Sequence, residues 1–420
     1  MGDYMFNRDY FITRIKPQYD SMFIKILVGI RSSGKTTLIS QIISDIKEND
    51  IADDNHLINI NLELIENEKY RHADYFYKFL SESILDDNQY FVFIDEINYM
   101  PKFEYMLKSL SDNYFNLSIF VTCSNSRALP EDLSSVLMNK YKLFYITPLS
   151  YSETCKALNT EPHNKNMLLN YLKYGGFPAR LPLKKSSEVK RLFYTNLDLI
   201  YLKDIVMRVG ITDIQELNWI IKALFNFIGK RISINDLNEY FKENNIDIPE
   251  HLLYTLLDSL CKALIICECN SYDVENEKIL RGRTKQYYFN DLGFGFIFSH
   301  DILNNMTATL KNLVWIELKK RGYEVYNGLN GEKSFDFVAI RNQRVLYFQV
   351  VHKLEDGNSI NKEIEKLQSS NPSHTRYLLS LDKENYSRKG VVHKNIIDFL
   401  LEDMNDIETE NDYTSWIAVD

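Results

Sequence analysis

Short apolar runs alternate with amphipathic segments over the first 150 residues. The apolar runs, each bounded by polar residues or turn residues, are Phe23–Val28, Leu57–Leu62, Tyr90–Ile94, Leu117–Thr122 and Tyr141–Ile146. The segments between them predict helices over Thr36–Ile46, Tyr75–Leu85, Phe103–Leu110 and Pro130–Met138. This alternation predicts an α/β domain over residues 1–150, with a parallel sheet covered by helices on both faces.

The pattern changes after Pro148. Residues 151–210 predict helices without strands, at Asn164–Lys173 and Lys190–Val206, separated by the helix-breaking segment Tyr174–Pro178. We interpret this stretch as a helical lid.

Residues 211–300 predict helices followed by strands. The helices are expected at Ile214–Ile228, Ile234–Glu243 and Pro249–Cys261, and two apolar runs, Ala263–Glu268 and Gln286–Asn290, follow on either side of a polar turn at 271–283. Three helices and a two-stranded hairpin are the order of a winged helix.

Residues 301–405 predict a small α/β domain, and residues 406–420 form an acidic tail that we expect to be frayed or disordered. Helices are expected at Ala308–Arg321 and Ile360–Gln368, and apolar runs lie at Tyr323–Val325, Phe335–Ile340, Val345–Val351, Arg376–Leu381 and Ile396–Leu401. The whole chain is thus expected to hold several domains.

Charge and cysteine content narrow the class of protein. Lysine and arginine number 49 against 58 acidic residues, for a net charge of −9, so any nucleic-acid contact must come from a local basic patch. No run of 18 apolar residues predicts a membrane span. The chain has 5 cysteines, an odd number, and its first residues include acids and no apolar leader segment. Together these features predict a reduced, cytoplasmic protein.

One motif carries specific chemistry. Residues 29–36, GIRSSGKT, satisfy G-x-x-x-x-G-K-[ST] between a predicted strand and a predicted helix. In such a loop the glycines let backbone N–H groups face phosphate oxygens, Lys35 reaches the β and γ phosphates, and Thr36 offers its hydroxyl to Mg²⁺. The predicted nucleotide-binding residues are Gly29, Ile30, Arg31, Ser32, Ser33, Gly34, Lys35, Thr36 and Thr37, and ATP with Mg²⁺ is the expected ligand.

Acidic and polar residues at the ends of two later runs would complete the site. Asp95 follows the buried run at 91–94 and is expected to hold Mg²⁺ together with Thr36, while Glu96 would polarise the attacking water. Ser124 and Asn125 follow the run at 117–122, and either could bond the water or the γ-phosphate.

These residues resemble a known family. The segments ILVGIRSSGKTTLI, FVFIDEIN, VTCSNS, ITPLSYSE, LKYGGFP and YYFNDLG together resemble the bacterial and archaeal AAA-type ATPases that carry a C-terminal domain of unknown function. The resemblance implies ATP binding at Lys35 and Thr36, Mg²⁺ at Asp95, catalysis through Glu96 and sensing near Ser124. The sequence departs from the family's commonest pattern at residues 30–33, where a proline, a polar residue and a valine are frequent.

Hydrolysis in such ATPases often uses an arginine from a neighbouring subunit, so a protein partner or a homo-oligomer is expected. Arg127, Arg180 and Arg208 are candidates by position alone, and each is better explained as a surface or ion-pairing arginine.

The winged-helix segment gives mixed signals for DNA contact. The helix opened by Pro249 would enter a major groove, yet its expected surface of Glu250, His251, Tyr254, Thr255 and Asp258 holds two acids and no lysine or arginine. The wing carries four cations that could touch phosphates: Lys278, Arg281, Arg283 and Lys285.

The last domain has the order of a restriction-endonuclease-like fold, which it resembles. Its candidate metal ligands are Glu317 and Asp336, but Gln349 stands where a second acid is needed and Val351 where a lysine is needed. Lys353 lies on the same strand face as Val351 and is a candidate for a displaced lysine. We therefore expect a degenerate nuclease-like domain used for packing or partner contact.

The remaining cysteines and histidines give no ligand pattern. Cys267 and Cys269 lie two apart without a second pair at zinc-site spacing, so they are expected to be buried thiols, and His300 and His352 receive no chemical role. The sequence as a whole predicts an ATP-driven AAA-type switch. Two alternatives remain: an ATP-controlled DNA-processing enzyme with an active nuclease domain, and a scaffold that holds nucleotide without turnover.

Overall fold

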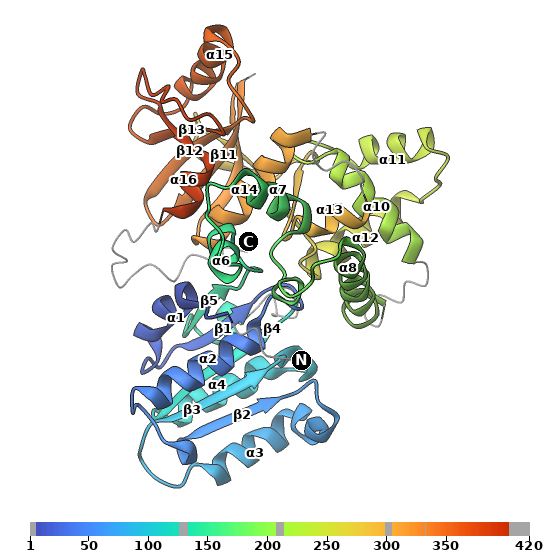
Figure 1. Ribbon diagram of the computed structural model, residues 1–420. Helices are drawn as coiled ribbons and strands as arrows, with labels where there is room; N and C mark the ends of the chain where they lie inside the picture. Colours follow the sequence, from blue (N-terminus) through green and yellow to red (C-terminus); the bar gives the residue numbers. More distant parts are fainter. Residues whose placement is uncertain (1–5, 126–132, 207–213, 299–304, 332, 403–420) are drawn as a thin grey trace. The chain divides into compact units, whose positions relative to one another are not determined.

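The computed structural model describes residues 6–125, 133–206, 214–298, 305–331 and 333–402 (Figure 1). These residues form two compact units, of which the first ends at Ile146 and the second begins at Thr147. The predicted helical lid, winged-helix segment and last α/β segment all fall in the second unit. Among the described residues, no helix combines the length and the apolar character that crossing a bilayer requires.

The first unit is built on a five-stranded sheet. Its strands are β1 (Ile24–Val28), β2 (Leu57–Asn61), β3 (Tyr90–Asp95), β4 (Leu117–Cys123) and β5 (Tyr141–Tyr145), in the order β2-β3-β4-β1-β5. Every pair of neighbours is parallel. The parallel sheet predicted from the apolar runs is therefore confirmed, and the strand that precedes the glycine-rich loop lies between β4 and β5.

Helices cover this sheet on both faces, as predicted. They are α1 (Asp9–Ile15), α2 (Lys35–Glu48), α3 (Ala73–Ser83), α4 (Phe103–Asn113) and the short α5 (Leu133–Val136). The first residues of the helix predicted at Pro130–Met138 lie outside the described residues. Helix α1 has no counterpart among the predicted elements.

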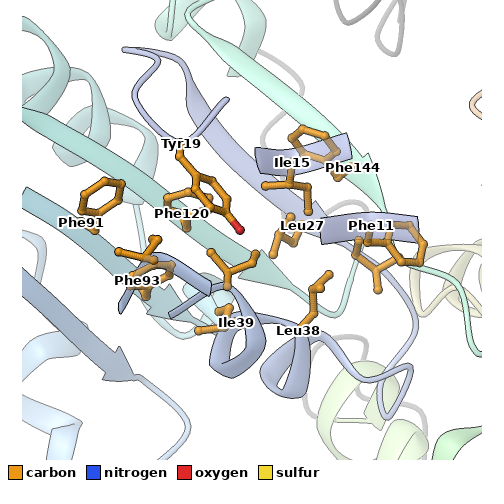
Figure 2. Packing of buried hydrophobic residues seen from close by; sticks show 13 residues of the cluster. Phe11, Ile15, Tyr19, Leu27, Leu38, Ile39, Phe91, Phe93, Phe120 and Phe144 are labelled. Carbon is orange, nitrogen blue, oxygen red and sulfur yellow. The ribbon is translucent and has the colours of Figure 1, made fainter. Parts of the chain in front are cut away.

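One core cluster joins α1 and α2 to the sheet, as Figure 2 shows. Phe11 and Ile15 of α1 and Leu38 of α2 pack on the sheet face that carries Leu27 and Phe120. The alternate side chains on the opposite face, including Val92, Ile94, Ile119 and Val121, are also buried. Burial on both faces explains why these strands read as continuous apolar runs rather than as alternating ones.

A lysine is buried within this apolar sheet. Lys25 of β1 is fully buried; its ammonium donates to Ser118 Oγ at 2.8 Å and to the Ser21 carbonyl at 3.0 Å, and lies 4.6 Å from the centre of the Phe120 ring. Burial lowers the pKa of Lys25 to about 7, because desolvation disfavours the charged form.

The second unit begins with helices, which confirms the helical character predicted for residues 151–206. The helices are α6 (Tyr151–Ala157), α7 (Lys165–Tyr174), α8 (Ser186–Ile200), the π-helical turn η7 (Tyr201–Val206), α10 (Ile214–Asn226), α11 (Ile234–Glu243) and α12 (Glu250–Lys262). Helix α13 (Gly293–Phe298) packs against α7 and α8.

A buried carboxylate explains two of the glycine-containing segments. Asp291 accepts hydrogen bonds from the N–H groups of Gly176 and Gly293, both at 2.7 Å. A Cβ at Gly175, whose φ is +64°, would lie 1.7 Å from Asp291 Oδ1. Burial raises the pKa of Asp291 to about 7, against the opposite effect of these hydrogen bonds and of Arg180. The LKYGGFP and YYFNDLG segments therefore hold each other in place by close approach around one carboxylate.

The polar turn predicted at 271–283 is not a simple turn. The flanking runs form β6 (Ile266–Cys269) and β9 (Gln286–Phe289), an antiparallel pair as predicted. Between them the chain forms β7 (Ser271–Asp273) and β8 (Lys278–Leu280), and β7 pairs in parallel with β10 (Glu324–Asn330) of the following segment. The prediction was wrong here because three-residue strands in a polar stretch have too few apolar positions to show a period.

Strands β7 and β8 thus extend a seven-stranded sheet in the order β14-β13-β12-β11-β10-β7-β8. Its other members and their helices are α14 (Met306–Lys320), β11 (Lys333–Arg341), β12 (Arg344–Val350), α15 (Gly357–Gln368), β13 (Thr375–Ser380), β14 (Val392–Asn395) and α16 (Ile396–Leu401). The predicted helices and strands are confirmed, the run at Ile396–Leu401 is a helix, and the acidic tail at 406–420 lies outside the described residues.

Replacing Lys25 with methionine should stabilise the first unit and flatten its pH dependence. The pKa of Lys25 is about 10.5 in an unfolded chain and about 7 in the fold, so the unfolded chain binds the extra proton between these values. Wild-type stability should therefore rise from pH 7 toward pH 10, and Lys25→Met should gain on the order of 1–3 kcal/mol at pH 7, with the gain shrinking as pH rises.

Denaturant unfolding at several pH values measures this difference. Lys78→Met, at a side chain that is 74% exposed, is the matched control and should leave the pH slope unchanged. Parallel pH slopes for wild type and Lys25→Met would contradict the assignment.

Candidate functional site

The loop between β1 and α2 requires both of its glycines. A Cβ at Gly29 would lie 2.1 Å from the Ile146 carbonyl oxygen, closer than any side chain can come. Gly34 has φ +98°, in the region that glycine adopts without strain, and α2 begins at the next residue. The loop therefore turns directly from a central strand into the N-terminus of a 14-residue helix, where backbone N–H groups favour anions.

Lys35 is the first residue of α2 and is buried beneath this loop. Its ammonium donates to the carbonyl oxygens of Gly29, at 2.8 Å, and of Ile30, at 3.2 Å, and lies 3.9 Å from Glu96 Oε1. Burial lowers the pKa of Lys35, and the nearby Glu96 carboxylate opposes that effect. The lysine thus links the loop to the end of β3.

Three hydrogen bonds hold the Asp95 carboxylate at the end of β3. Thr36 Oγ1 donates to Asp95 Oδ2 at 2.7 Å, Asn61 Nδ2 donates to the same oxygen at 3.1 Å, and the Thr122 hydroxyl donates to Oδ1. Burial raises the pKa of Asp95, while the bonds from Thr122 and Thr36 lower it. Thr36 and Asp95, predicted to share a metal ion, lie in direct contact.

Glu96 is oriented by β4. Its backbone N–H donates to Thr122 Oγ1 at 2.8 Å, and Ser124 Oγ donates to Glu96 Oε2 at 2.8 Å. Glu96 has φ +56°, a left-handed conformation that is uncommon outside glycine and is often found at functional sites. Of the two polar residues left open by the sequence, Ser124 contacts Glu96, whereas Asn125 is buried and its carbonyl accepts from the Cys123 thiol.

Sequence reasoning missed several residues of this site. Asn61 ends β2 and Thr122 lies near the end of β4, and both bond Asp95. Glu63, two residues beyond β2, was also missed, and it pairs with the predicted loop residue Arg31 at 3.2 Å. The Arg31 guanidinium lies 3.5 Å from Ser124 Oγ. The missing signal was strand order, because β2 and β4 are the two neighbours of β3 and their ends therefore lie beside Asp95.

The oxygen donors at Thr36 and Asp95 fit Mg²⁺. A hydroxyl and a carboxylate 2.7 Å apart are the hard ligands that this ion uses, with water and phosphate oxygens completing its shell. Over the described parts of the chain no cluster of three histidine, cysteine or acidic side chains could hold a metal by itself.

Of the three candidate arginine fingers, the structure describes only Arg180. Arg127 and Arg208 lie outside the described residues. Arg180 is 4% exposed and donates to the Gly175 carbonyl at 2.7 Å and to Asn170 Oδ1 at 3.1 Å. Because a buried side chain cannot reach a neighbouring subunit, the suggestion that Arg180 is an arginine finger was wrong.

The two nuclease-like acids each have a cation of their own. Asp336 on β11 is paired with Lys311 of α14 at 2.5 Å and accepts the Val350 N–H at 2.8 Å. Glu317 is paired with Arg321 at 2.7 Å. Gln349 Oε1 lies 3.3 Å from the Asp336 backbone nitrogen, and Lys353 is exposed. Each of the two carboxylates is therefore already partnered by a cation of the same chain.

The predicted DNA-contacting surfaces also differ from each other. Along α12 the residues Glu250, His251, Tyr254 and Thr255 are exposed, and no cation is among them. Lys278, Arg281 and Arg283 are exposed on β8 and the segment after it, whereas Lys285 is paired with Glu268.

Cys269 is buried as predicted, and Cys267 is partly buried. His300 lies outside the described residues.

Two families match parts of the chain. Residues 21–155 match the family described as AAA domain, and residues 165–298 match a domain of unknown function, DUF8612. The first match spans β1 to β5 and includes every residue of the site described above. Residues 21–155 are therefore similar to an AAA domain, and their parallel sheet with a glycine-rich loop fits the α/β fold of a P-loop NTPase.

Similar proteins extend over most of the chain. An uncharacterized protein of Haemophilus influenzae is 28% identical over 367 residues, covering 85% of this chain and 89% of its own. Uncharacterized protein MJ1544 of Methanocaldococcus jannaschii is 28% identical over 360 residues, covering 81% and 77%. Among solved structures, the Walker-type ATPase PABY2304 of Pyrococcus abyssi covers 70% of this chain and 95% of its own at 15% identity, with a TM-score of 0.47. The Orc1 protein of Aeropyrum pernix in complex with DNA has a TM-score of 0.33 at 14% identity, covering 73% of this chain and 96% of its own.

Replacing Thr122 with valine should destabilise the first unit. Valine keeps the shape of threonine and suits a strand, but it removes the donor to Asp95 and the acceptor of the Glu96 N–H. Loss of the bonds to Asp95 Oδ1 and to the Glu96 N–H should cost about 2–4 kcal/mol of unfolding free energy, whereas Thr122→Ser, which keeps the hydroxyl, should cost much less. Urea unfolding measures the difference, and equal stability of the valine and serine variants would refute the bridging role.

Proposed function

We propose that this protein binds ATP together with Mg²⁺ and hydrolyses it as an AAA-type switch. The observation that carries the proposal is the convergence of four groups at the carboxyl edge of one parallel sheet. Lys35 and Thr36 come from the loop after β1, and Asp95 and Glu96 come from the end of β3, with Thr36 bonded to Asp95 and Lys35 beside Glu96. The match of residues 21–155 to an AAA domain supports the same conclusion.

In this proposal the loop residues 29–34 and the first residues of α2, through Thr37, bind the phosphates with backbone N–H groups. Lys35 would exchange its bonds with the Gly29 and Ile30 carbonyls for β- and γ-phosphate oxygens. Burial favours that exchange, because a desolvated ammonium gains more from an anion than from neutral carbonyls. Thr36 and Asp95 would hold Mg²⁺, which neutralises phosphate charge when it is bound.

Glu96 would act as the general base. Its carboxylate would accept a proton from water as the water oxygen bonds to the γ-phosphorus and the bond to the β–γ bridging oxygen breaks, giving ADP and inorganic phosphate. Ser124 donates to Glu96 Oε2, so we assign Ser124 an orienting role. Asn125 stays a second candidate for contact with the water or the γ-phosphate.

The second unit is proposed to contact a partner, which is another protein, a second copy of the chain or a nucleic acid. The exposed Lys278, Arg281 and Arg283 favour a phosphate backbone as one such contact, although α12 offers no cation for reading a groove. The alternative of an active nuclease is a second proposal, and we rank it lower because Asp336 and Glu317 each already pair with a cation. A winged helix and a degenerate restriction-endonuclease-like domain remain the proposed folds of this unit.

Glu96→Gln should separate binding from turnover. Glutamine keeps the size of the side chain but cannot accept the proton, so ATP affinity should persist while turnover falls by on the order of 10²-fold or more. Titration calorimetry with ATP and a phosphate-release assay measure the two quantities on the same preparation.

Lys35→Ala is the matched control, because it should abolish or severely weaken ATP binding by removing the ammonium placed for the phosphates. Wild-type turnover in Glu96→Gln would remove the catalytic role of Glu96, and an unchanged dissociation constant in Lys35→Ala would overturn the nucleotide site. Wild-type ATP binding without any phosphate release would favour the scaffold alternative.

Reversing the charges of Arg281 and Arg283 should weaken DNA binding. If these cations contact phosphates, the wild type should bind a short duplex with a dissociation constant in the roughly 10⁻⁴–10⁻⁶ M range of non-specific contacts, more weakly as salt rises. Arg281→Glu with Arg283→Glu should abolish this binding, whereas Lys362→Glu with Lys383→Glu, an equal charge change at two other exposed positions, should leave most of it. Equal losses in both double variants, measured by fluorescence anisotropy, would show net charge rather than a site.

A further inference from the structure

An arginine outside the matched AAA segment is buried against the phosphate-binding loop. Arg8 precedes α1, is 2% exposed, and its Nη1 donates to the carbonyl oxygen of Ser33 at 3.0 Å. Its guanidinium also lies 4.7 Å from the centre of the Phe11 ring. The AAA match begins at residue 21 and does not include Arg8, and the proposed function gives Arg8 no role.

The segment that carries Arg8 has a separate anchor on α2. The Arg8 backbone N–H donates to Gln41 Oε1 at 3.0 Å, and Gln41 Nε2 donates to the Phe6 carbonyl at 2.8 Å. Gln41 and the apolar packing of α1 thus fix the backbone of this segment, while the guanidinium reaches beyond it to the loop. Burying a guanidinium carries a desolvation cost that a merely structural anchor would not need.

The carbonyl that Arg8 contacts belongs to the peptide between Ser33 and Gly34. In a trans peptide the C=O and the N–H point in opposite directions, so fixing the Ser33 carbonyl also fixes the direction of the Gly34 N–H. A cation at the carbonyl further polarises the peptide and strengthens its N–H as a donor. Gly34, with φ +98°, is a position where the backbone has wide freedom to reorient without such a restraint.

We propose that Arg8 is a positioning residue that holds the Ser33–Gly34 peptide with its N–H directed toward the β-phosphate of a bound nucleotide. The inference rests on the proposed nucleotide site. Arg8 lies on the carbonyl side of the peptide and acts through the backbone, so its contribution is a donor that is already oriented before the ligand arrives. The same contact would serve ADP and ATP, since both carry a β-phosphate.

Arg8→Gln, Arg8→Lys and Gln41→Leu test the proposal. Arg8→Gln removes the charge, Arg8→Lys keeps a charged donor without the planar fork, and Gln41→Leu loosens the N-terminal segment but keeps the guanidinium. Calorimetric titration with MgADP should show affinity weakened about tenfold or more in Arg8→Gln, by less in Arg8→Lys, and unchanged in Gln41→Leu. Thermal melts without nucleotide report how much stability each variant loses.

A nucleotide-free measurement separates this inference from the proposed function. In selectively ¹⁵N-glycine-labelled protein, which has 15 glycines, the amide resonance of Gly34 should shift in Arg8→Gln and stay in place in Gln41→Leu, because only the first changes the bond at the Ser33 carbonyl. A Gly34 resonance that does not move in Arg8→Gln overturns the proposal, and so does a wild-type affinity of Arg8→Gln for MgADP. The proposal is also overturned if the loss of MgADP affinity is proportional to the loss of melting temperature in all three variants. Failure of the wild type to bind MgADP would instead overturn the nucleotide site, and the Gly34 shift would still decide the role of Arg8.

Discussion

The register between β3 and β4 is the constraint on which the site depends. Ile94 lies opposite Val121, so the next residues along, Asp95 and Thr122, come side by side at the end of the sheet. A slip of one residue would turn the Thr122 hydroxyl to the other face and remove it from the Asp95 carboxylate and the Glu96 N–H. Because β1 pairs with β4 in turn, the same register sets where the loop after β1 meets the carboxylates.

This arrangement buries charged side chains, which costs desolvation free energy, and the hydrogen bonds to those side chains offset part of that cost. Lys35, Asp95 and Glu96 are each less than a tenth exposed. The Lys35 ammonium bonds to a backbone carbonyl, the Asp95 carboxylate to the Thr122 hydroxyl of β4, and the Glu96 carboxylate to the buried Ser124 hydroxyl just after β4, so none relies on a flexible surface partner. Groups held in this way lose little further freedom when a charged ligand arrives, which is what a preorganised site requires.

Much of the first unit could be predicted from its sequence because its strands are buried on both faces and its loop must contain two glycines. That the phosphate-loop residues lie beside Asp95 and Glu96 could be predicted from their positions in the sequence. The contacts of Asn61, Glu63 and Arg8 with the same site could not, since they depend on strand order and on a packed N-terminal helix, neither of which the local pattern encodes. The choice between Ser124 and Asn125 likewise needed side-chain direction, which alternates along a strand and is lost once the strand ends.

In the second unit, local patterns found the helices but not the way the chain returns to its sheet. Strands β7 and β8 are short and polar, and β7 is a strand because β10, more than fifty residues later, offers it hydrogen bonds. A long-range pairing of this kind leaves no trace in hydrophobic periodicity. The contacts of Asp291 with two glycines are another case. The glycines and the aspartate are visible in the sequence, but the close approach of the two backbone segments that requires glycine is not.

The pairing of β7 with β10 also determines where this half of the chain could be cut. The family match that ends at residue 298 stops in the middle of a sheet, since β7 and β8 lie before that point and the five strands they join lie after it. A fragment ending there would carry a two-stranded ribbon with one long row of backbone donors and acceptors open to other chains, which is a known route to aggregation. Strands β10 to β14, at residues 324–395, therefore cover the edge that β7 would otherwise leave open.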